Sequence, residues 1–282
     1  MNSIQWFPGH MAKTMKQLQQ QINEVDIIIE CIDARSPFSC ANNFFKELST
    51  KKEGLIVITK TDLADKDQNQ AWKTILDTES SPCFLVDIPK KKGIKEILSY
   101  CNAYSEKKRQ KKSFLITKVM VIGLPNIGKS ALINALAKKQ ATRVQNRPAI
   151  TQQLQWVMIN PHVALLDTPG ILMPKIHNPE TSYKLALIKC IKDHLFDPLI
   201  ITRWLIQFIT IHHLDRLEAR YKITIGSLHE EEIIIQIAKS RQCLLPNHEI
   251  DFNKVCRLII GDYRDGKLGR ITFDQADKSL IW

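Results

Sequence analysis

The sequence predicts an α/β domain with a mostly parallel sheet flanked by helices, followed by a smaller, mainly helical domain. The length of 282 residues exceeds a single typical domain of about 100–200 residues. Short β-branched runs alternate with helical patterns in the first part of the chain, and from about residue 183 the pattern is mostly helical. Hydrophobic residues make up 44% of the chain, which is enough to build a buried core.

Short apolar runs are the predicted strands of the sheet. They are rich in β-branched residues, and apolar runs of this kind between helices favour parallel strands that are covered on both faces. The runs are residues 25–32, 55–59, 83–86, 118–122 and 163–166.

The remaining segments indicate the domain organisation. We interpret the charge run at 105–113 as a solvated linker between two strand–helix units. After residue 183 the helical pattern continues to about residue 221 with an interruption at Pro198, and the last part of the chain combines a helix-like segment with Gly-rich loops. We therefore predict two domains, 1–176 and 177–282.

Charge and cysteine content narrow the function classes. Forty Lys and Arg against 29 Asp and Glu give a net charge of +11, which favours a polyanionic partner such as nucleic acid, a ribosome or an acidic membrane; the alternative is a basic surface with no dedicated partner. Seven Cys without a CxxC pair indicate reduced cysteines and argue against zinc. No secretory signal or membrane-spanning run is visible, so we expect a cytoplasmic protein.

Residues 123–130, GLPNIGKS, match the phosphate-loop pattern G-x-x-x-x-G-K-[ST] between a predicted strand and a predicted helix at about 129–138. Its glycines let consecutive N–H groups point at phosphates, and the helix N-terminus adds partial positive charge. We expect Lys129 to reach the β- and γ-phosphates and act in catalysis, and the Ser130 hydroxyl to bind Mg²⁺. The predicted nucleotide contacts here are Pro125, Asn126, Ile127, Gly128, Lys129, Ser130 and Ala131.

A second phosphate motif, DTPG at 167–170, follows another predicted strand. Asp167 is expected to hold Mg²⁺ through water, and the Gly170 N–H to contact the γ-phosphate. Thr151 is the candidate for the mobile Thr that completes the Mg²⁺ shell, although its neighbours RPAITQQ depart from the usual pattern. In many GTPases the position directly after D-x-x-G carries a Gln that orients the attacking water. Here that position is Ile171, so the catalytic group must come from elsewhere.

Residues 59–62, TKTD, end a predicted strand and match a guanine-recognition motif. Asp62 is expected to accept hydrogen bonds from guanine N1–H and the exocyclic amine, a donor pair that adenine lacks. The Lys60 stem would lie along the base. Thr59 stands where Asn is usual and offers a hydroxyl without the amide pair, so we expect somewhat weaker base affinity.

The second base motif, usually Ser-Ala-Lys, is degenerate in LVDIP at 85–89. Asp87 and Ile88 take the places of Ser and Ala. The contact to guanine O6 comes from a backbone N–H, so it could survive this change.

The base motif precedes the phosphate loop, which reverses the order of an ordinary GTPase. A circular permutation keeps the three-dimensional site because only the connection between the old termini changes. The joint would be the basic segment at 105–113, and the chain beyond residue 175 would read the nucleotide state mechanically. The sequence thus predicts a circularly permuted P-loop GTPase domain.

With these motifs, the chain resembles the circularly permuted GTPases of the ribosome biogenesis GTPase A family over nearly its whole length. The similar segments are WFPGHMAK (6–13), DARSP (33–37), TKTD, GLPNIGKS, LLDTPGIL (165–172) and DYRDGKLGRIT (262–272). The resemblance implies hydrolysis of GTP to GDP and phosphate, slow alone and stimulated by the ribosomal particle. It also implies a C-terminal helical RNA-binding domain and a role in maturation of the large ribosomal subunit through rRNA. We expect no membrane partner, and the sequence leaves the oligomeric state open, with a monomer favoured.

The expected cofactor is Mg²⁺, with Ser130, Thr151 and Asp167 as its ligands. In several potassium-activated GTPases an Asn at the place of Asn126 helps to hold the cation, so Asn126 is a candidate K⁺ ligand; the alternative is a loop Asn that caps the backbone. We hypothesise that His10, which Pro8-Gly9 can place outside helix geometry, approaches the γ-phosphate when the subunit is bound; the alternative is a surface or packing role. Arg35 is a second candidate with a stronger structural interpretation.

Cationic residues of the C-terminal part are the predicted rRNA phosphate contacts, with a solvated basic face as the alternative. They are Lys254, Arg257, Arg264, Lys267 and Arg270. Two other functions stay open. One is a generic P-loop ATPase, against which TKTD argues. The other is an RNA-binding, nucleotide-regulated module with little or no intrinsic hydrolysis, which the degenerate segment 85–89 and Ile171 keep open.

Overall fold

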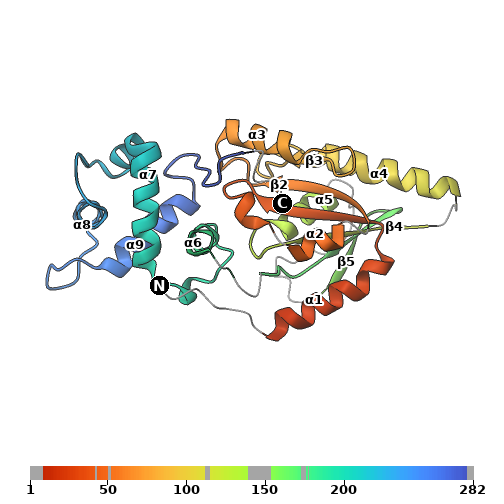
Figure 1. The fold of residues 1–282 in the computed structure, drawn as a ribbon, viewed down its shortest axis with the longest axis horizontal. Coiled ribbons are helices and arrows are strands. Elements are labelled where there is room, and N and C mark those ends of the chain that lie inside the picture. Colours follow the sequence, from red (N-terminus) through yellow and green to blue (C-terminus); the bar gives the residue numbers. More distant parts are fainter. Residues whose placement is uncertain are drawn as a thin grey trace. The chain divides into compact units, whose positions relative to one another are not determined.

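The computed structural model describes residues 9–41, 43–49, 52–111, 115–138, 154–172, 176 and 178–277, and the chain forms two compact units. One unit contains the described residues up to 172 together with 272–277, and we call it the G unit. The other runs from Ile176 to Ile271 in its described part, and we call it the helical unit. Figure 1 shows the strands in the first and only helices in the second.

The G unit is built on a six-stranded sheet with the order β3-β2-β1-β4-β6-β5. All neighbouring strands are parallel except β5, which is antiparallel to β6. The strands are β1 (Ile27–Asp33), β2 (Glu53–Thr59), β3 (Cys83–Leu85), β4 (Thr117–Gly123), β5 (Gln155–Asn160) and β6 (Val163–Asp167). The central strand β1 is buried along its whole length, as expected for a sheet covered on both faces.

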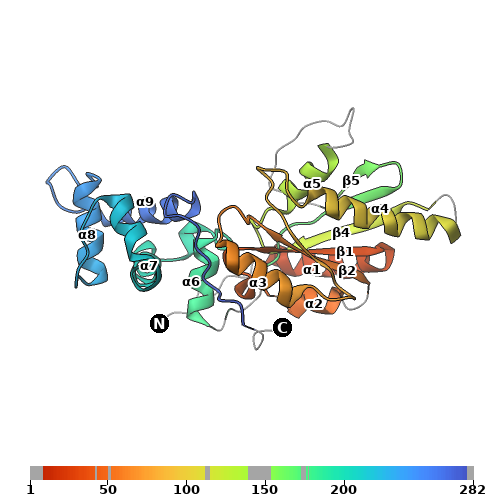
Figure 2. The ribbon, with the colours of Figure 1, turned by 90° about the horizontal axis from the view of Figure 1, so that it is seen from above.

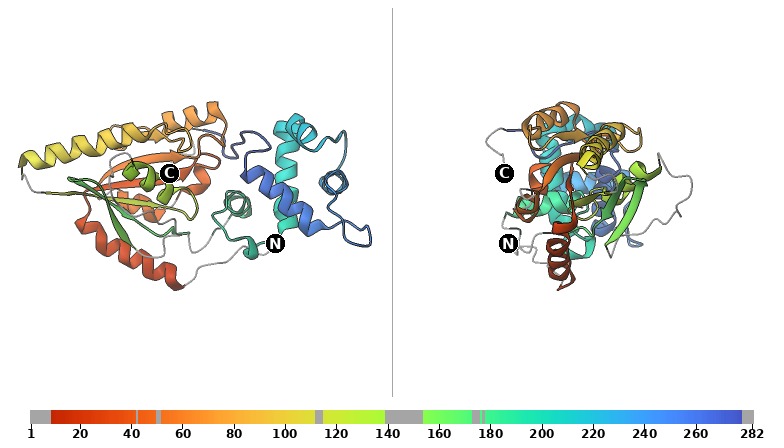
Figure 3. Two further views of the ribbon diagram at one scale, coloured as in Figure 1. Left: turned by 180° about the vertical axis from the view of Figure 1, so that it is seen from behind. Right: turned by 90° about the vertical axis from the view of Figure 1, so that its right-hand side faces the viewer.

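Helices cover both faces of this sheet. Figures 1 and 3 show α3 and α4 on one side and α1 on the other. The helices of the G unit are α1 (Gly9–Gln21), α2 (Asn43–Ser49), α3 (Lys66–Leu76), α4 (Ile94–Lys111) and α5 (Lys129–Lys138), with short 3₁₀ turns at η1 (Ile22–Glu24) and η2 (Phe38–Cys40). The predicted α/β class with a mostly parallel sheet is confirmed.

The interpretation of 105–113 as a solvated linker is wrong for residues 105–111, which form the last turns of α4. Lys and Arg are good helix formers, and this helix end is fixed to the sheet by side chains. Ser105 is buried, and Lys108 pairs with Asp26 at 2.6 Å just before β1. The chain then enters β4 at Thr117, so a helix leads up to the joint of the permutation.

The helical unit contains α6 (Pro179–Leu187), η3 (Asp193–Leu195), α7 (Pro198–Tyr221), α8 (Glu230–Ser240) and α9 (Phe252–Arg264). Figure 2 shows α7, α8 and α9 packed together. Pro198 begins α7 because the first helical position needs no N–H, and Asp197 caps the helix by accepting a hydrogen bond from the Leu199 N–H at 2.8 Å. In the described part of the chain, none of the helices has the length and apolar character that a membrane span requires.

The C-terminal residues 272–277, which we call the C-terminal strap, belong to the G unit and not to the helical unit. The predicted boundary between 1–176 and 177–282 therefore differs from the structure at this end. Phe273 and Asp274 are buried against the G unit, and the Phe273 N–H donates a hydrogen bond to the Arg35 carbonyl at 2.8 Å. The helical unit is thus an insertion between two segments of the G unit.

Candidate nucleotide-binding site

The phosphate loop joins the end of β4 to the start of α5, as the motif requires. Gly123 and Gly128 have φ angles of +148° and +105°, which L-side chains rarely adopt. A Cβ on Gly123 would lie 2.4 Å from Ile127 Cδ1 and 2.6 Å from the Cys31 carbonyl oxygen. Both the backbone angles and the close packing therefore require glycine at the first position of this loop.

Lys129 lies inside the loop and is buried. Its Nζ donates to the carbonyl oxygens of Leu124 at 2.8 Å and Gly123 at 3.2 Å. These two acceptors hold the ammonium group against the backbone of the loop, and a bound phosphate would compete for its hydrogen bonds. Ser130 follows it in the first turn of α5.

The DTPG motif contacts this loop directly. Asp167 is buried at the end of β6, where it pairs in register with Val121 of β4. The Ile171 N–H donates to the Gly123 carbonyl at 3.3 Å, and a Cβ on Gly170 would meet Pro125 Cα at 2.4 Å. The two phosphate motifs therefore form one surface, with Gly170 required by the close approach of the two backbones.

The donor set fits a magnesium ion. Mg²⁺ prefers oxygen ligands, and the site offers a hydroxyl from Ser130 at the start of α5 and a carboxylate from Asp167 at the end of β6. The strand register places both near the phosphate loop: β4 ends at Gly123, the first residue of the loop, and Asp167 pairs in register with Val121 of the same strand. Thr151, the third predicted ligand, lies outside the described residues.

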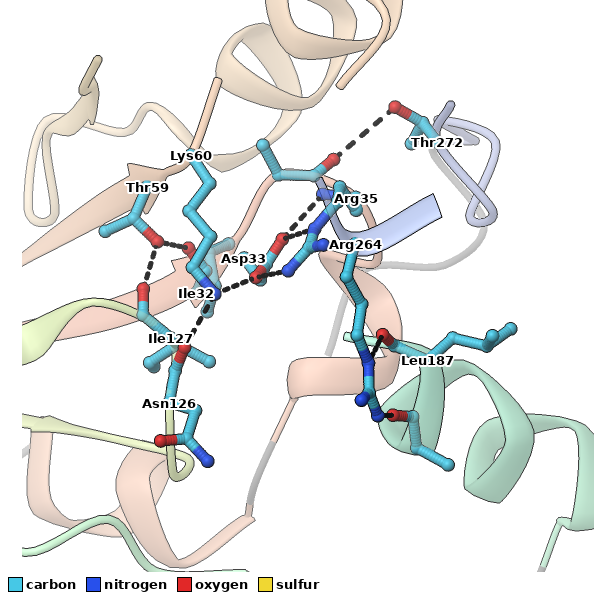
Figure 4. A network of polar contacts seen from close by, with 12 residues as sticks. Ile32, Asp33, Arg35, Thr59, Lys60, Asn126, Ile127, Leu187, Arg264 and Thr272 are labelled. Carbon is cyan, nitrogen blue, oxygen red and sulfur yellow. Dashed lines mark hydrogen bonds and ion pairs between the residues drawn. The ribbon is translucent and has the colours of Figure 1, made fainter. Parts of the chain in front are cut away.

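At the base end, Thr59 and Lys60 are tied to the phosphate loop (Figure 4). The buried Thr59 hydroxyl lies 2.5 Å from the Ile127 carbonyl oxygen and 2.9 Å from that of Ile32. Lys60 Nζ donates to the Asn126 carbonyl at 2.6 Å. Although Thr59 replaces the usual Asn, the end of β2 is thus held against the loop by side-chain bonds to its backbone.

Asp33 at the end of β1 completes this network, and the sequence analysis missed it. The Arg35 guanidinium binds its carboxylate with both Nε (2.9 Å) and Nη2 (2.8 Å), and Lys60 Nζ lies 3.0 Å from Oδ2. Burial alone would raise the pKa of Asp33, but the charges of Arg35 and Lys60 and the hydrogen bonds from Arg35 hold it well below its usual range. Asp33 is therefore a permanent anion that orients Lys60.

A signal for Asp33 was present in the sequence. The parallel strands β1 and β2 pair with Asp33 opposite Thr59, so a polar residue at the end of one lies beside the motif at the end of the other. Arg35, the second catalytic candidate, is buried and bound to Asp33, which is the geometry of a structural residue.

The degenerate segment after β3 forms a tight turn beside TKTD. The Asp87 carboxylate accepts from the Lys90 N–H at 2.9 Å, and the backbones of Asp87 and Lys92 exchange hydrogen bonds. The Thr61 N–H donates to the Val86 carbonyl at 3.4 Å. The sequence-predicted base contacts from the two strand ends, including Asp62 and Ile88, therefore belong to adjacent loops at one edge of the sheet.

His10 differs from its hypothesised setting. Its backbone lies in the first turn of α1, so Pro8-Gly9 does not take it out of helix geometry. A helix that begins at Gly9 includes it because the second residue of the helix already follows the helical path. Its side chain lies outside the described part of the structure.

Comparisons with known proteins agree with this geometry. A family model described as 50S ribosome-binding GTPase matches residues 118–220. The chain is 33% identical to ribosome biogenesis GTPase A of Bacillus cereus over 98% of its own length and 95% of the relative. It is also 33% identical to mitochondrial ribosome-associated GTPase 1 of Mus musculus, over 96% of this chain and 90% of that one.

Solved structures show the same fold. The crystal structure of GNP-bound YlqF from T. maritima aligns with a TM-score of 0.63 at 22% identity, covering 94% of this chain and 99% of that chain. A GDP-bound structure of YlqF gives a TM-score of 0.61 at 23% identity. At 22% and 23% identity, the structural similarity supports the fold and carries no conclusion about function.

Proposed function

Since this chain belongs to the ribosome biogenesis GTPase A family, we propose that it is a GTPase that binds the large ribosomal subunit or its precursor through rRNA and promotes its maturation. The observation that carries the proposal is the connection of the base motif to the phosphate loop through Lys60 and Thr59. A reversed motif order is compatible with one nucleotide site only if the two segments meet in space. We expect the protein to act as a monomer in the cytoplasm.

The residues have the following proposed roles in hydrolysis. Lys129 would leave the carbonyl oxygens of Gly123 and Leu124 for the β- and γ-phosphates, and the Gly170 N–H would contact the γ-phosphate. Ser130, Asp167 and Thr151 would hold Mg²⁺, which offsets the charge that develops on the transferred group.

Asn126 is the proposed K⁺ ligand. It has a left-handed backbone with φ of 58°, and its carbonyl oxygen accepts the hydrogen bond from Lys60. If turnover is the same when sodium replaces potassium, K⁺ is removed from the proposal.

The proposed base contacts are Asp62, in the loop that follows β2, and the turn at Asp87 and Ile88, which follows β3.

Turnover also needs a group that replaces the usual Gln, because Ile171 is buried and cannot orient water by hydrogen bonding. We keep His10 as the candidate, acting only when the subunit is bound. The substitution His10→Ala should then reduce subunit-stimulated turnover at least about 10-fold, within the range of one general acid–base group, and leave GDP affinity unchanged. Unchanged stimulated turnover would exclude His10.

The proposed rRNA contacts must be revised from the predicted set. The Arg264 guanidinium donates to the carbonyl oxygens of Ala186 (2.8 Å) and Leu187 (3.0 Å) and pairs with Asp193, so it holds α9 to α6. We therefore assign Arg264 a structural role inside the helical unit. Lys267, another residue of the predicted set, pairs with Asp265 at 2.9 Å.

A basic pocket in the helical unit is the better candidate for phosphate binding. It has a volume of about 590 Å³ and is lined by Arg216, Ala219, Arg220, Lys222, Arg241, Lys267, Leu268 and Gly269. Arg216 donates to the Arg270 carbonyl at 2.5 Å, and Arg241 donates to the Arg220 carbonyl. These acceptors are neutral, so they fix both guanidinium groups and leave their charges available to a polyanion.

The Tyr221 ring helps to fix two of these side chains. The guanidinium carbons of Arg241 and Arg220 lie 5.5 and 6.0 Å from its centroid. Four of the five basic residues that line the pocket lie outside the Gly-rich segment, which is why the sequence analysis did not group them: Arg216, Arg220, Lys222 and Arg241. We propose that rRNA phosphates bind this pocket.

The test is GTP turnover in potassium buffer with and without purified large ribosomal subunits. We expect strong stimulation, and we expect Lys222→Asn, which removes one pocket charge at a left-handed position, to weaken subunit binding about 3- to 10-fold. Lys239→Gln, an exposed lysine of α8, is the matched control. Absence of turnover with subunits and potassium present would favour a nucleotide-regulated RNA-binding module instead.

A further inference from the structure

The C-terminal strap is fixed to the G unit by buried polar contacts. The Asp274 carboxylate accepts from the Ser39 N–H (2.7 Å) and from the Ser39 hydroxyl (3.1 Å). The Trp72 indole N–H donates to the Asp274 carbonyl at 2.8 Å. Asp274, Ser39 and Trp72 are all buried, so each of these groups would lose a hydrogen-bond partner in a dry environment if the strap detached.

These contacts and the other hydrogen bonds of the strap fall on the loop that follows β1 and on the segment that leads from TKTD into α3, which contains Trp72. One loop follows Asp33, the last residue of β1, and contains Arg35 and Ser39; we call it the Asp33 loop. It receives the Asp274 bonds and the bond from the Phe273 N–H to the Arg35 carbonyl. The strap is therefore one hydrogen bond away from the residue whose guanidinium holds the Asp33 carboxylate.

The other loop leads from TKTD into α3. The Asp65 N–H, three residues after the motif, donates to the Thr272 hydroxyl at 3.0 Å. Further along, the Ala276 N–H donates to Gln68 Oε1 at 2.8 Å in the first turn of α3. The strap thus bridges the ends of β1 and β2, which carry Asp33 and Thr59 side by side.

We infer that the C-terminal strap, through Asp274, is a positioning element of the guanine-binding end of the site. It holds the Asp33 loop and the TKTD loop in fixed register, so that Asp33 orients Lys60 and Asp62 meets the base. The hydrogen bonds of the strap lie on the loops that follow β1 and β2 and on α3, all on the base side of the nucleotide site. We therefore expect its contribution to be larger for base affinity than for phosphate affinity.

This arrangement has a consequence for the helical unit. The unit begins shortly after DTPG, at Ile176, and ends at Ile271, immediately before the strap. Both of its chain ends are thus continuous with elements of the nucleotide site: the first with the γ-phosphate motif and the second with the element that positions the base. If a ligand of the helical unit shifts the chain at either of these two ends, it changes the affinity of the site for guanine nucleotides. By thermodynamic linkage, the bound nucleotide then changes the affinity of the helical unit for that ligand.

The experiment compares two ligands that share phosphates but differ in the base. Dissociation constants of GDP and of pyrophosphate, both with Mg²⁺, are measured for the full-length chain and for Asp274→Ala. We expect the GDP constant to rise about 5- to 20-fold, the range for the loss of buried hydrogen bonds to a charged group, while the pyrophosphate constant changes by less than about 2-fold. The GDP dissociation rate should rise in parallel.

Two further variants make the outcome decisive. Gln275→Ala changes the exposed neighbour in the strap and should leave both constants unchanged. Ser39→Ala removes only the hydroxyl contact and should weaken GDP about 2- to 4-fold, and it replaces Asp274→Ala if that variant does not fold. An unchanged GDP constant, or an equal weakening of GDP and pyrophosphate, would overturn the inference.

Discussion

The phosphate end and the base end of the nucleotide site are built in different ways. At the phosphate end, GLPNIGKS and DTPG keep their consensus residues, and the contacts use backbone groups and a single lysine, Lys129. At the base end, Thr59 and the segment 85–89 depart from consensus, and side chains from three separate segments hold the loops together.

The difference follows from what each end recognises. Phosphates are bound by backbone N–H groups, which need glycines and a helix N-terminus at fixed spacing, so the chain has little freedom there. A base is recognised by its edge, and the loops that present the carboxylate can be positioned by many side-chain networks. Here Asp33 and Arg35 supply such a network, and the C-terminal strap supports it.

The largest expected effect is at the phosphate end. Lys129→Ala removes the only charged side chain within the phosphate loop, residues 123–130. We expect the dissociation constants of GDP and pyrophosphate to rise together by at least about 100-fold, as for the loss of a buried charge contact with phosphate. Lys95→Ala, an exposed lysine of α4, should change neither constant.

A smaller and more selective effect is expected at the base end. Thr59→Val keeps the shape of the side chain but removes the hydroxyl that bonds the Ile127 carbonyl. We expect GDP to bind about 3- to 10-fold more weakly, with pyrophosphate less affected, while Thr59→Ser, which keeps the hydroxyl, stays close to wild type. Equal losses for both ligands would mean that the two ends are not energetically separate.

The smallest effect on binding is expected from Glu30, which lies in β1 outside both ends. Burial raises its pKa from 4.5 to about 7, so the folded protein keeps a proton that the unfolded chain has already lost. The contribution of Glu30 to the free energy of unfolding is therefore fully present below pH 4.5 and is lost as the pH rises to about 7. The full difference is on the order of 3 kcal/mol.

Glu30→Gln should remove this dependence. Unfolding in denaturant at pH 5 and pH 8 should show the variant gaining about 1–3 kcal/mol over wild type at the higher pH only, with nucleotide affinities unchanged. A constant difference across the pH range would show that the Glu30 carboxyl does not titrate in this window.

Much of the G unit could be predicted from sequence because buried parallel strands and phosphate loops leave strong local patterns. The five predicted strands and α5 are present within a few residues of their expected bounds. The edge strand β5 was missed because only one of its six residues is buried and because Gln155 and Asn160 are polar. Residues 105–111 were misread because a run of lysines suits both a linker and the solvated face of a helix.

Long-range contacts could not be predicted in this way. The strap lies more than 200 positions from the loops it binds, and nothing local in Thr272 or Asp274 marks a partner. Arg264 was grouped with RNA contacts because its charge is visible in the sequence, whereas its hydrogen bonds to the end of α6 are not. Contacts of this kind depend on the tertiary fold.

The most direct test is competition between GDP and ADP for the wild-type chain. If the base end holds Asp62 in place despite its departures from consensus, GDP should bind at least about 1,000-fold more tightly than ADP, because adenine leaves the carboxylate without its donors. Equal affinities would contradict guanine recognition and leave a generic phosphate-loop nucleotidase.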